Sequence, residues 1–230
     1  MSLFLTQGDG EYLLKPVGYA ALIIIMLLIL FGLYLWNDKK NKNVTTRQLV
    51  FSAVGMALAL VTSYMKLASL PFGGSITLFS MFFIVFIGYL FGVNAGLTAA
   101  VAYGILQLII EPYIFHPVQV LLDYPLAFGM LGLSGFFANK KHGLMIGYAV
   151  SVLGRYICHV ISGYIFFGAY APEGSNAFIY TLSYNLTYIL PEFIATMVLL
   201  VIPAVSSALT HVKRMATEAE TVKKVQNSQV

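Results

Sequence analysis

The most unusual feature of this sequence is how little charge it carries. Charged residues make up 10% of the 230 positions, whereas hydrophobic residues make up 59%. Soluble globular domains contain about 25% charged residues, so this shortage excludes a soluble domain and indicates a protein that crosses a lipid bilayer several times. We attribute the formal net charge of +4 to the placement of Lys and Arg relative to the membrane, and not to nucleic-acid binding.

The sequence also lacks the common motifs of catalysis, nucleotide hydrolysis and metal binding. Its single cysteine, Cys158, excludes an intrachain disulfide. No G-x-x-x-x-G-K-[ST] motif is present, so the chain hydrolyses no nucleotide by itself, and no G-x-S-x-G nucleophile elbow occurs. The four histidines show no zinc-binding spacing. We therefore expect no catalytic residue, no metal site and no cofactor.

The N-terminus lacks the positive charge of a cleaved signal peptide. The first residues hold Asp9 and Glu11 beside Lys15, and no small-residue cleavage site follows them. The apolar run Val17–Trp36 contains about 20 residues, enough to cross a hydrocarbon core about 30 Å thick. We expect it to be a permanent first transmembrane span.

Six further apolar spans follow, separated by turn signals. The nearly continuous stretch Ile76–Ile110 is too long for one span, and we divide it at Gly92–Asn94. Together with Val17–Trp36, these spans predict an all-α, polytopic membrane helix bundle. The six expected spans are Val50–Lys66, Ile76–Phe91, Ala95–Ile110, Val118–Ala138, Leu144–Phe167 and Phe178–Val205.

Lysine and arginine orient the spans. Most of the 13 basic residues lie in the linker Asn37–Arg47, the loop Asn139–Gly143 and the tail after Thr210. Seven spans place all three on one side, which the positive-inside rule makes cytoplasmic. We expect a multi-pass plasma-membrane protein with its N-terminus outside and its C-terminus in the cytoplasm. The expected parts are an extra span and basic linker at 1–43, a six-helix membrane domain at 44–210 and a polar cytoplasmic tail at 211–230.

Polar side chains share one depth in three different spans. At 1.5 Å per helical residue, Asp123, His159 and Asn185 each lie about 10 Å inside the outer end of their spans. Tyr124 and Tyr180 flank them. Ionisable groups are costly in hydrocarbon and usually face a cavity, a partner or a substrate path. Each residue could instead satisfy only a local backbone group, but five at one level favour a pocket that opens to the outside.

Arg155 and Glu192 form a second pair of charges, deeper in two consecutive antiparallel spans. A paired charge is tolerated in the membrane where a lone one is not. We therefore expect a structural ion pair that clamps the two helices, with a role in substrate binding as the alternative.

A stripe of small residues marks the second span. Ala53 and Ala57 are four residues apart, and Gly55 and Ala59 repeat this spacing one register further on. Such faces let another helix approach closely, so we expect a helix-packing surface here.

Five strings of the sequence are specific when they are taken together. Over about residues 46–206, the chain resembles the thiamine-specific substrate-binding (S) component of energy-coupling factor vitamin transporters. The resemblance implies a six-helix S-component core, to which Val17–Trp36 adds one extra N-terminal transmembrane helix. The strings that carry it are Glu111–Gln119, Leu122–Phe128, Arg155–His159, Ile165–Pro172 and Tyr180–Asn185.

The resemblance implies a bacterial membrane subunit that binds thiamine with high affinity for ATP-driven uptake. Its implied partners are a transmembrane coupling subunit, which docks on the face of Ala53 and Ala57, and two cytoplasmic ATPase subunits. The missing nucleotide-binding motif fits this division of labour. The family's substrate-binding positions fall on Tyr113, Asp123, Tyr124, His159, Phe167, Tyr180 and Asn185.

Three positions depart from the family pattern. Asp123 stands where glutamate also occurs, which shortens the reach of the carboxylate. Phe167 stands where a tryptophan is expected. A tryptophan of the first outer loop has no counterpart and falls near Gly74.

Two other functional classes stay open at this point. One is an autonomous secondary carrier for a cationic vitamin, coupled to protons through Asp123, His159 or Glu192. The other is an intramembrane enzyme, which the missing nucleophile–base pair and metal set disfavour. Uptake by the reconstituted chain alone, driven by a proton gradient without ATPases, would indicate the carrier.

Overall fold

The computed structural model describes residues 5–8, 11–15, 17, 21, 24, 28 and 44–227. The expected first span, Val17–Trp36, therefore lies largely outside the described residues. Ahead of it, β1 (Leu5–Gly8) and β2 (Glu11–Leu14) pair as an antiparallel hairpin that the sequence did not predict.

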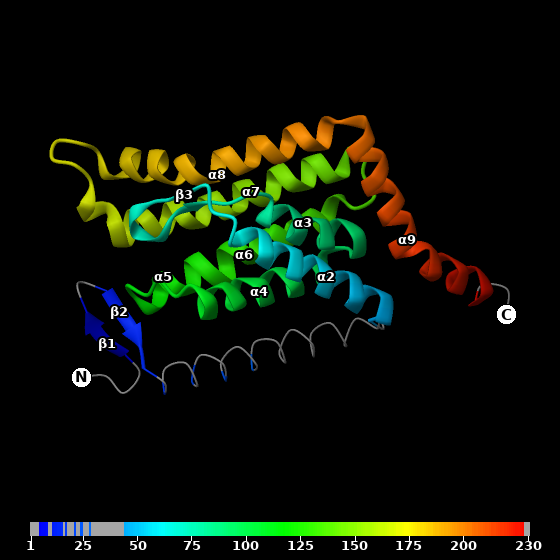
Figure 1. Cartoon of the computed structure of the whole chain (residues 1–230), viewed down its shortest axis with the longest axis horizontal. Coiled ribbons are helices and arrows are strands. Elements are labelled where there is room, and N and C mark those ends of the chain that lie inside the picture. The colour runs from blue at the N-terminus through cyan, green and yellow to red at the C-terminus, as the bar shows by residue number, and fades with distance from the viewer. Residues whose placement is uncertain are drawn as a thin grey trace.

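Six helical runs form one bundle, and their long axes lie side by side (Figure 1). Five of them are long and apolar enough to cross a membrane, and the sixth, α3, is a shorter apolar helix. The chain is thus an all-α, multi-pass membrane protein. Five of the six spans expected after residue 44 are confirmed, and the remaining one corresponds to the shorter helix α3. The runs are α2 (Thr46–Ser63), α3 (Ser80–Phe91), α4 (Val93–Ile110), Pro117–Phe137, Gly143–Tyr170 and α8 (Ala177–Val201).

Two of the runs change helix type along their length. The first consists of α5 (Pro117–Leu121), the π-helical turn η2 (Leu122–Leu126), α6 (Ala127–Gly129) and the 3-10 helix η3 (Met130–Phe137). The second consists of α7 (Gly143–Ser162), the π-helical turn η4 (Gly163–Phe167) and the 3-10 turn η5 (Gly168–Tyr170). Pro125 lies inside η2, where it cannot donate the helical hydrogen bond. Turns of the π type often occur at functional sites.

Glycines bring α3, α4 and η3 into close contact. A Cβ atom on Gly96 of α4 would lie 2.7 Å from the Cα of Gly88 and 2.8 Å from the carbonyl oxygen of Gly132, so no larger residue fits. Gly92, between α3 and α4, has a φ of 88°, a left-handed conformation that favours glycine. The predicted division of the long apolar stretch at Gly92 is confirmed.

The chain enters α3 as a non-helical segment. Between α2 and α3, β3 (Ala68–Ser69) and β4 (Ser75–Ile76) form a short antiparallel hairpin around the 3-10 turn η1 (Pro71–Gly73). Helix α3 then begins at Ser80, later than the predicted start at Ile76. Irregular backbone at membrane depth is tolerated where it is buried in protein or lines a cavity, and this segment lines the cavity described below.

The C-terminal region differs from the prediction. The sequence predicts a last span to Val205 and a polar tail from residue 211, but α9 (Pro203–Asn227) is a 25-residue helix that begins inside that span. Proline cannot continue the hydrogen bonding of α8 and favours extended backbone at the preceding residue. Ile202 is accordingly extended, with a ψ of 121°. Figure 1 shows α9 turning across the end of the bundle opposite the β1–β2 hairpin.

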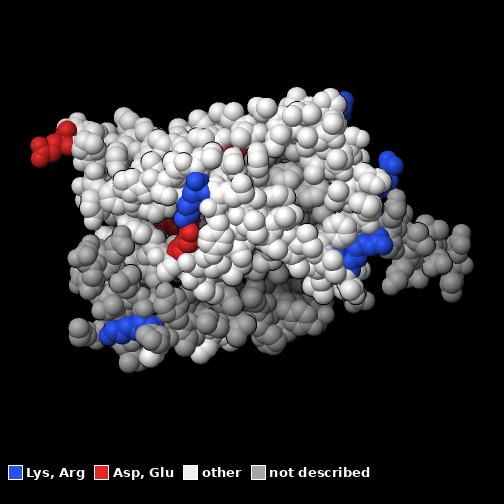
Figure 2. Space-filling view, viewed as in Figure 1, with Lys and Arg blue, Asp and Glu red and all other residues white. Residues whose placement is uncertain are grey.

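Basic side chains fasten α9 to the bundle. Nη1 of Arg47 donates to the carbonyl oxygen of Met215 at 2.8 Å. Lys213 donates to the carbonyl oxygen of Ala138, and its Nζ lies 3.7 Å from the centre of the Tyr89 ring. Figure 2 shows Lys and Arg gathered at this end, whereas the surface of the helices between the two ends carries few charged side chains.

Candidate binding site

One end of the bundle contains a cavity beneath the β3–β4 hairpin and the segment that follows α4. Its walls come from η2, α7, η4 and α8 as well as from these two connections. All seven side chains that the sequence predicts for the site line this cavity, so the structure brings every one of them together. They are Tyr113, Asp123, Tyr124, His159, Phe167, Tyr180 and Asn185. Their contact with a ligand stays a prediction.

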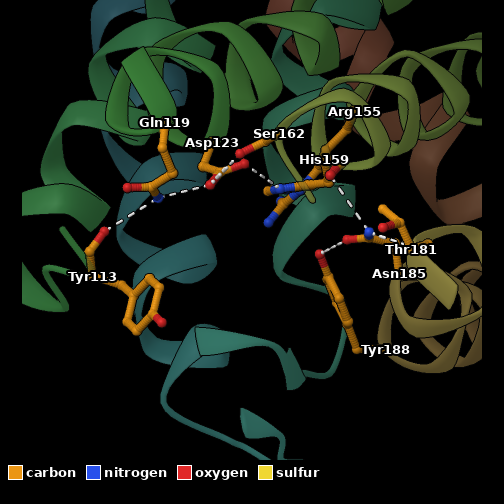
Figure 3. A network of polar contacts seen from close by, with 9 residues as sticks. All are labelled: Tyr113, Gln119, Asp123, Arg155, His159, Ser162, Thr181, Asn185 and Tyr188. Atoms are coloured by element: carbon orange, nitrogen blue, oxygen red, sulfur yellow. Dashed lines mark hydrogen bonds and ion pairs between the residues drawn. The ribbon is translucent and has the colours of Figure 1, made fainter. Parts of the chain in front are cut away.

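Asp123 is the centre of a polar network (Figure 3). Its Oδ1 lies 3.0 Å from Nδ1 of His159, and its Oδ2 accepts hydrogen bonds from Nε2 of Gln119 at 2.7 Å and Oγ of Ser162 at 2.9 Å. The side chains of Asp123 and His159 are only 16% and 12% exposed. A carboxylate offers about four acceptor positions, so Asp123 is a largely buried acceptor that can still bind one more donor from the cavity.

Gln119 and Ser162 are members of the site that the sequence analysis missed. Gln119 is 1% exposed; its Nε2 also donates to the carbonyl oxygen of Tyr113 at 3.3 Å, and its Oε1 accepts from the backbone N–H of Phe115 at 3.1 Å. It therefore ties the segment after α4 to Asp123. A helical spacing could have identified both residues, since Gln119 precedes Asp123 by four positions and Ser162 follows His159 by three.

The predicted ion pair between Arg155 and Glu192 is wrong. Within the described part of the chain, Lys66 and Glu111 form an ion pair, and Asp123 contacts His159 and not Arg155. Arg155 instead donates from Nε to Nε2 of His159 at 3.2 Å. Its guanidinium also lies 4.0 Å from the centre of the Phe128 ring.

Glu192 caps the start of α3. Its Oε1 accepts from the backbone N–H of Met81 at 2.8 Å, and its Oε2 accepts from Oγ1 of Thr77 at 2.6 Å. The residue before the helix, Phe79, offers no side-chain hydrogen bond to these groups. Unpaired N–H groups at a helix start need acceptors and favour negative charge. These donors explain how a carboxylate that is 3% exposed is stabilised without Arg155.

Asn185 connects α8 to α7. Its Nδ2 donates to the carbonyl oxygen of Thr181 at 2.9 Å and of His159 at 3.4 Å, and its Oδ1 accepts from the hydroxyl of Tyr188 at 2.5 Å. The Tyr188 ring stands edge-on to His159, with 6.1 Å between ring centroids. Tyr188 was not predicted for the site, although it also lines the cavity.

The hydroxyl of Tyr124 is used by the segment after α4. It accepts from the backbone N–H of Tyr113 at 2.9 Å and donates to the carbonyl oxygen of Glu111 at 2.8 Å. Its ring lines the cavity. Tyr124 thus fixes the position of Tyr113, whose own ring is part of the cavity wall.

Aromatic rings form one wall around Phe167. Its ring centroid lies 5.3 Å from Phe115, 5.8 Å from Phe72 and 5.9 Å from Tyr113. Phe72 also lies 6.2 Å from Tyr184, whose hydroxyl donates to the Pro71 carbonyl oxygen. The sequence analysis found no aromatic counterpart near Gly74, but Phe72 supplies a ring from the same loop. Its left-handed backbone, with a φ of 60°, could not be predicted from local sequence.

Helix α2 divides its small residues between two faces. Gly55 packs against Ile87 of α3, where an added Cβ would lie 3.0 Å from the side chain, and Ala59 is completely buried. Ala53 and Ala57 are both exposed. The predicted interface residues thus remain available on the surface of the described bundle.

Comparisons with known proteins agree with this architecture. A family model described as thiamine transporter protein matches residues 49–212. The thiamine transporter ThiT of Bacillus subtilis (strain 168) is 39% identical over 165 residues, which are 66% of this chain and 84% of that protein. The thiamine transporter ThiT of Lacticaseibacillus paracasei (strain ATCC 334) is 35% identical over 104 residues, which are 38% of this chain and 52% of that protein.

A solved structure is also similar. The structure of ThiT from Listeria monocytogenes aligns with a TM-score of 0.56 and 26% identity, over 69% of this chain and 96% of that one. The family match covers more than half of the sequence and includes every predicted substrate-binding residue. The chain therefore belongs to the thiamine transporter protein family.

Proposed function

We propose that this chain is the thiamine-binding subunit of an ATP-driven vitamin uptake transporter of the energy-coupling factor type. The observation that carries the proposal is Asp123, a largely buried carboxylate held by three donors on the wall of an aromatic cavity. Buried anions in membrane proteins are costly and usually serve a ligand or an ion path. Thiamine uptake by family members supports the choice of ligand.

The chemistry of the cavity suits the two rings of thiamine. Thiamine joins an aminopyrimidine to a cationic thiazolium, and Asp123 can accept from the amino group or balance the positive charge. The rings of Tyr113, Phe167 and Tyr180 provide flat surfaces that stack on heterocycles and attract a cation. Tyr124, His159 and Asn185 complete the proposed contacts as polar groups. The proposed role is binding and release without covalent chemistry, so the chain is not an enzyme.

Coupling to the energy source is proposed to occur through α2. Ala53 and Ala57 form an exposed small-residue face beside Val54 and Leu58, and such faces suit close packing of another transmembrane helix. The proposed occupant is the coupling subunit, which two cytoplasmic ATPase subunits drive.

The proposed orientation puts the cavity outside and α9 in the cytoplasm. The positive-inside rule supports it, because Lys140, Lys141 and Arg214 are exposed and the loop that holds the two lysines adjoins α9 through the contact of Lys213 with Ala138. In this orientation, residues 1–43 carry an outer N-terminus and an extra span, residues 44–210 form the thiamine-binding domain and residues 211–230 form the cytoplasmic tail.

Two experiments test the proposal. Mass spectrometry of small molecules that co-purify with the detergent-solubilised protein should detect thiamine. Proteoliposomes that contain the chain alone should bind thiamine without accumulating it, and accumulation should need the coupling and ATPase subunits with ATP. Accumulation by the chain alone under a proton gradient would instead identify a secondary carrier.

A further inference from the structure

We propose that Arg155 is a positioning residue that holds His159 in its neutral form, so that the negative charge of Asp123 is left for the ligand. The inference rests on the proposed function for its ligand, but its first test needs no ligand. It replaces the structural ion pair predicted for Arg155 with a role in the site itself.

The hydrogen bonds around His159 determine its protons. An arginine has only donors, so Nε2 of His159, 3.2 Å from Nε of Arg155, must be the acceptor and carries no hydrogen. An ionised aspartate has only acceptors, so Nδ1 of His159, 3.0 Å from Oδ1 of Asp123, must be the donor. One ring nitrogen thus carries the proton and the other cannot, which describes a neutral imidazole with its hydrogen on Nδ1.

Several titratable or charged groups surround His159, and Arg155 is the one that contacts Nε2. Asp123 faces the ring from η2, Arg155 and Cys158 lie on its own helix, and Tyr188 and Glu192 face the cavity from α8. Among the described residues, Arg155 supplies the hydrogen bond at Nε2. A carboxylate beside an imidazole favours the doubly protonated, cationic ring. Burial of the ring, which is 12% exposed, works against that charge, and Arg155 adds a donor and a positive charge at Nε2 itself, which both oppose the second proton.

Arg155 is itself held in place for this task. Its guanidinium lies 4.0 Å from the centre of the Phe128 ring, and it precedes His159 by four residues, so the two side chains share one face of α7. A cationic His159 would pair directly with Asp123 and would compete with a cationic ligand for the same carboxylate. Arg155 places its positive charge one residue further away, so the hydrogen-bonded carboxylate of Asp123 keeps its negative charge for a ligand in the cavity.

The consequence is that binding is not coupled to a proton. A cationic ligand that displaced a proton from His159 would make affinity depend on pH. In the parent protein there is no such proton to displace, which separates this site from the proton-coupled carrier considered above.

The first test observes the empty protein by NMR after selective ¹⁵N labelling of histidine. The chain has four histidines, and the His159→Gln variant identifies the signals of His159 by their loss. At pH 7 the parent should show a neutral ring protonated on Nδ1 alone. A cationic ring, or a proton on Nε2, would overturn the proposal whatever the ligand is.

The second test uses two substitutions of Arg155. Arg155→Met keeps an unbranched stem over Phe128 but removes the donor, whereas Arg155→Lys keeps a positively charged group with donors only. His159 should become cationic at pH 7 in Arg155→Met and stay neutral in Arg155→Lys. Thermal unfolding of each variant shows whether it is folded.

Calorimetry then measures the protons exchanged on thiamine binding, from the dependence of the observed heat on the ionisation heat of the buffer. We expect close to zero protons for the parent and Arg155→Lys, and release of about one proton with about tenfold weaker binding for Arg155→Met. Equal proton counts in all three proteins would overturn the role of Arg155. If thiamine fails to bind while the NMR result holds, the proposed ligand is wrong but the role of Arg155 stands.

Discussion

Gln119 donates a hydrogen bond of 2.7 Å to Asp123 and a second to the carbonyl oxygen of Tyr113. One buried amide thus connects the carboxylate at the centre of the cavity to the segment that closes over it. The connection runs along one face of α5 and η2, since the two residues are four positions apart. A ligand that binds Asp123 therefore contacts a group whose position depends on the segment after α4.

Replacing Gln119 by leucine should weaken thiamine binding. The change removes the acceptor of the backbone N–H of Phe115 and one of the two donors to Oδ2 of Asp123. A lost hydrogen bond to a charged group costs about 1.5–3 kcal/mol. Titration calorimetry measures the loss. Ser162→Ala, which removes a donor from Asp123 without touching the segment after α4, is the matched control and should cost less. Equal losses in the two variants would show that the link to Tyr113 is unimportant.

The cap of α3 predicts a separate effect on stability. Glu192→Gln keeps the shape of the side chain and an oxygen that can accept from the N–H of Met81, but it removes the negative charge from the helix start. We expect the variant to unfold more easily by about 1–3 kcal/mol, as measured by thermal unfolding in detergent. Glu173→Gln, at an exposed loop position, should leave stability unchanged. If Glu192→Gln unfolds at the same temperature as the parent, Glu192 does not stabilise the start of α3.

The α2 face predicts a separation of transport from binding. The double substitution Ala53→Trp and Ala57→Trp should abolish thiamine uptake in cells, because two bulky rings prevent close helix packing. Binding by the purified protein should be intact. The matched control is Leu153→Trp with Ile157→Trp, which has the same spacing on exposed positions of α7. Normal uptake with both α2 substitutions would mean that coupling occurs elsewhere.

Phe167 offers an optical test of the aromatic wall. Trp36 is the only tryptophan, so a Trp36→Phe, Phe167→Trp protein carries one reporter inside the cavity. Thiamine should quench its fluorescence with saturation, since the new ring stacks on the ligand. The same reporter at Phe136, which is 64% exposed on η3, should not respond. Quenching of both reporters would indicate a nonspecific effect of the ligand.

The parts of the fold that the sequence predicts are those that depend on continuous apolar runs. The spans and the division at Gly92 follow from length, hydrophobicity and turn signals. The start of α9 at Pro203 does not, because the apolar run continues past the proline to Val205 and only tertiary contacts such as Arg47 to Met215 define where the polar helix lies. The late start of α3 is equally hidden, since Ile76–Phe79 is as apolar as the helix that follows.

Prediction of the site was limited in the same way, because it relied on regular helices. Depth along the helices correctly groups Asp123, His159 and Asn185, because a constant rise per residue converts position in the sequence into depth along a helix. It misassigns Glu192, whose partners are Thr77 on the non-helical segment and Met81 in the first turn of α3. A count of helical residues cannot place either of them, because α3 begins later than its apolar run. Phe72 was missed for a similar reason, since a left-handed loop residue directs its ring into the cavity.

The most direct measurement is titration calorimetry of thiamine with the ligand-free parent, Asp123→Asn and Glu173→Gln. The parent and Glu173→Gln should bind one thiamine with the same affinity, because Glu173 lies on an exposed loop. Asp123→Asn should bind more weakly by about 2–4 kcal/mol, since a buried cation loses its charged partner. If the folded parent does not bind thiamine, or if Asp123→Asn changes the affinity by less than about 0.5 kcal/mol, a small fraction of that expected loss, then Asp123 is not the centre of a thiamine site.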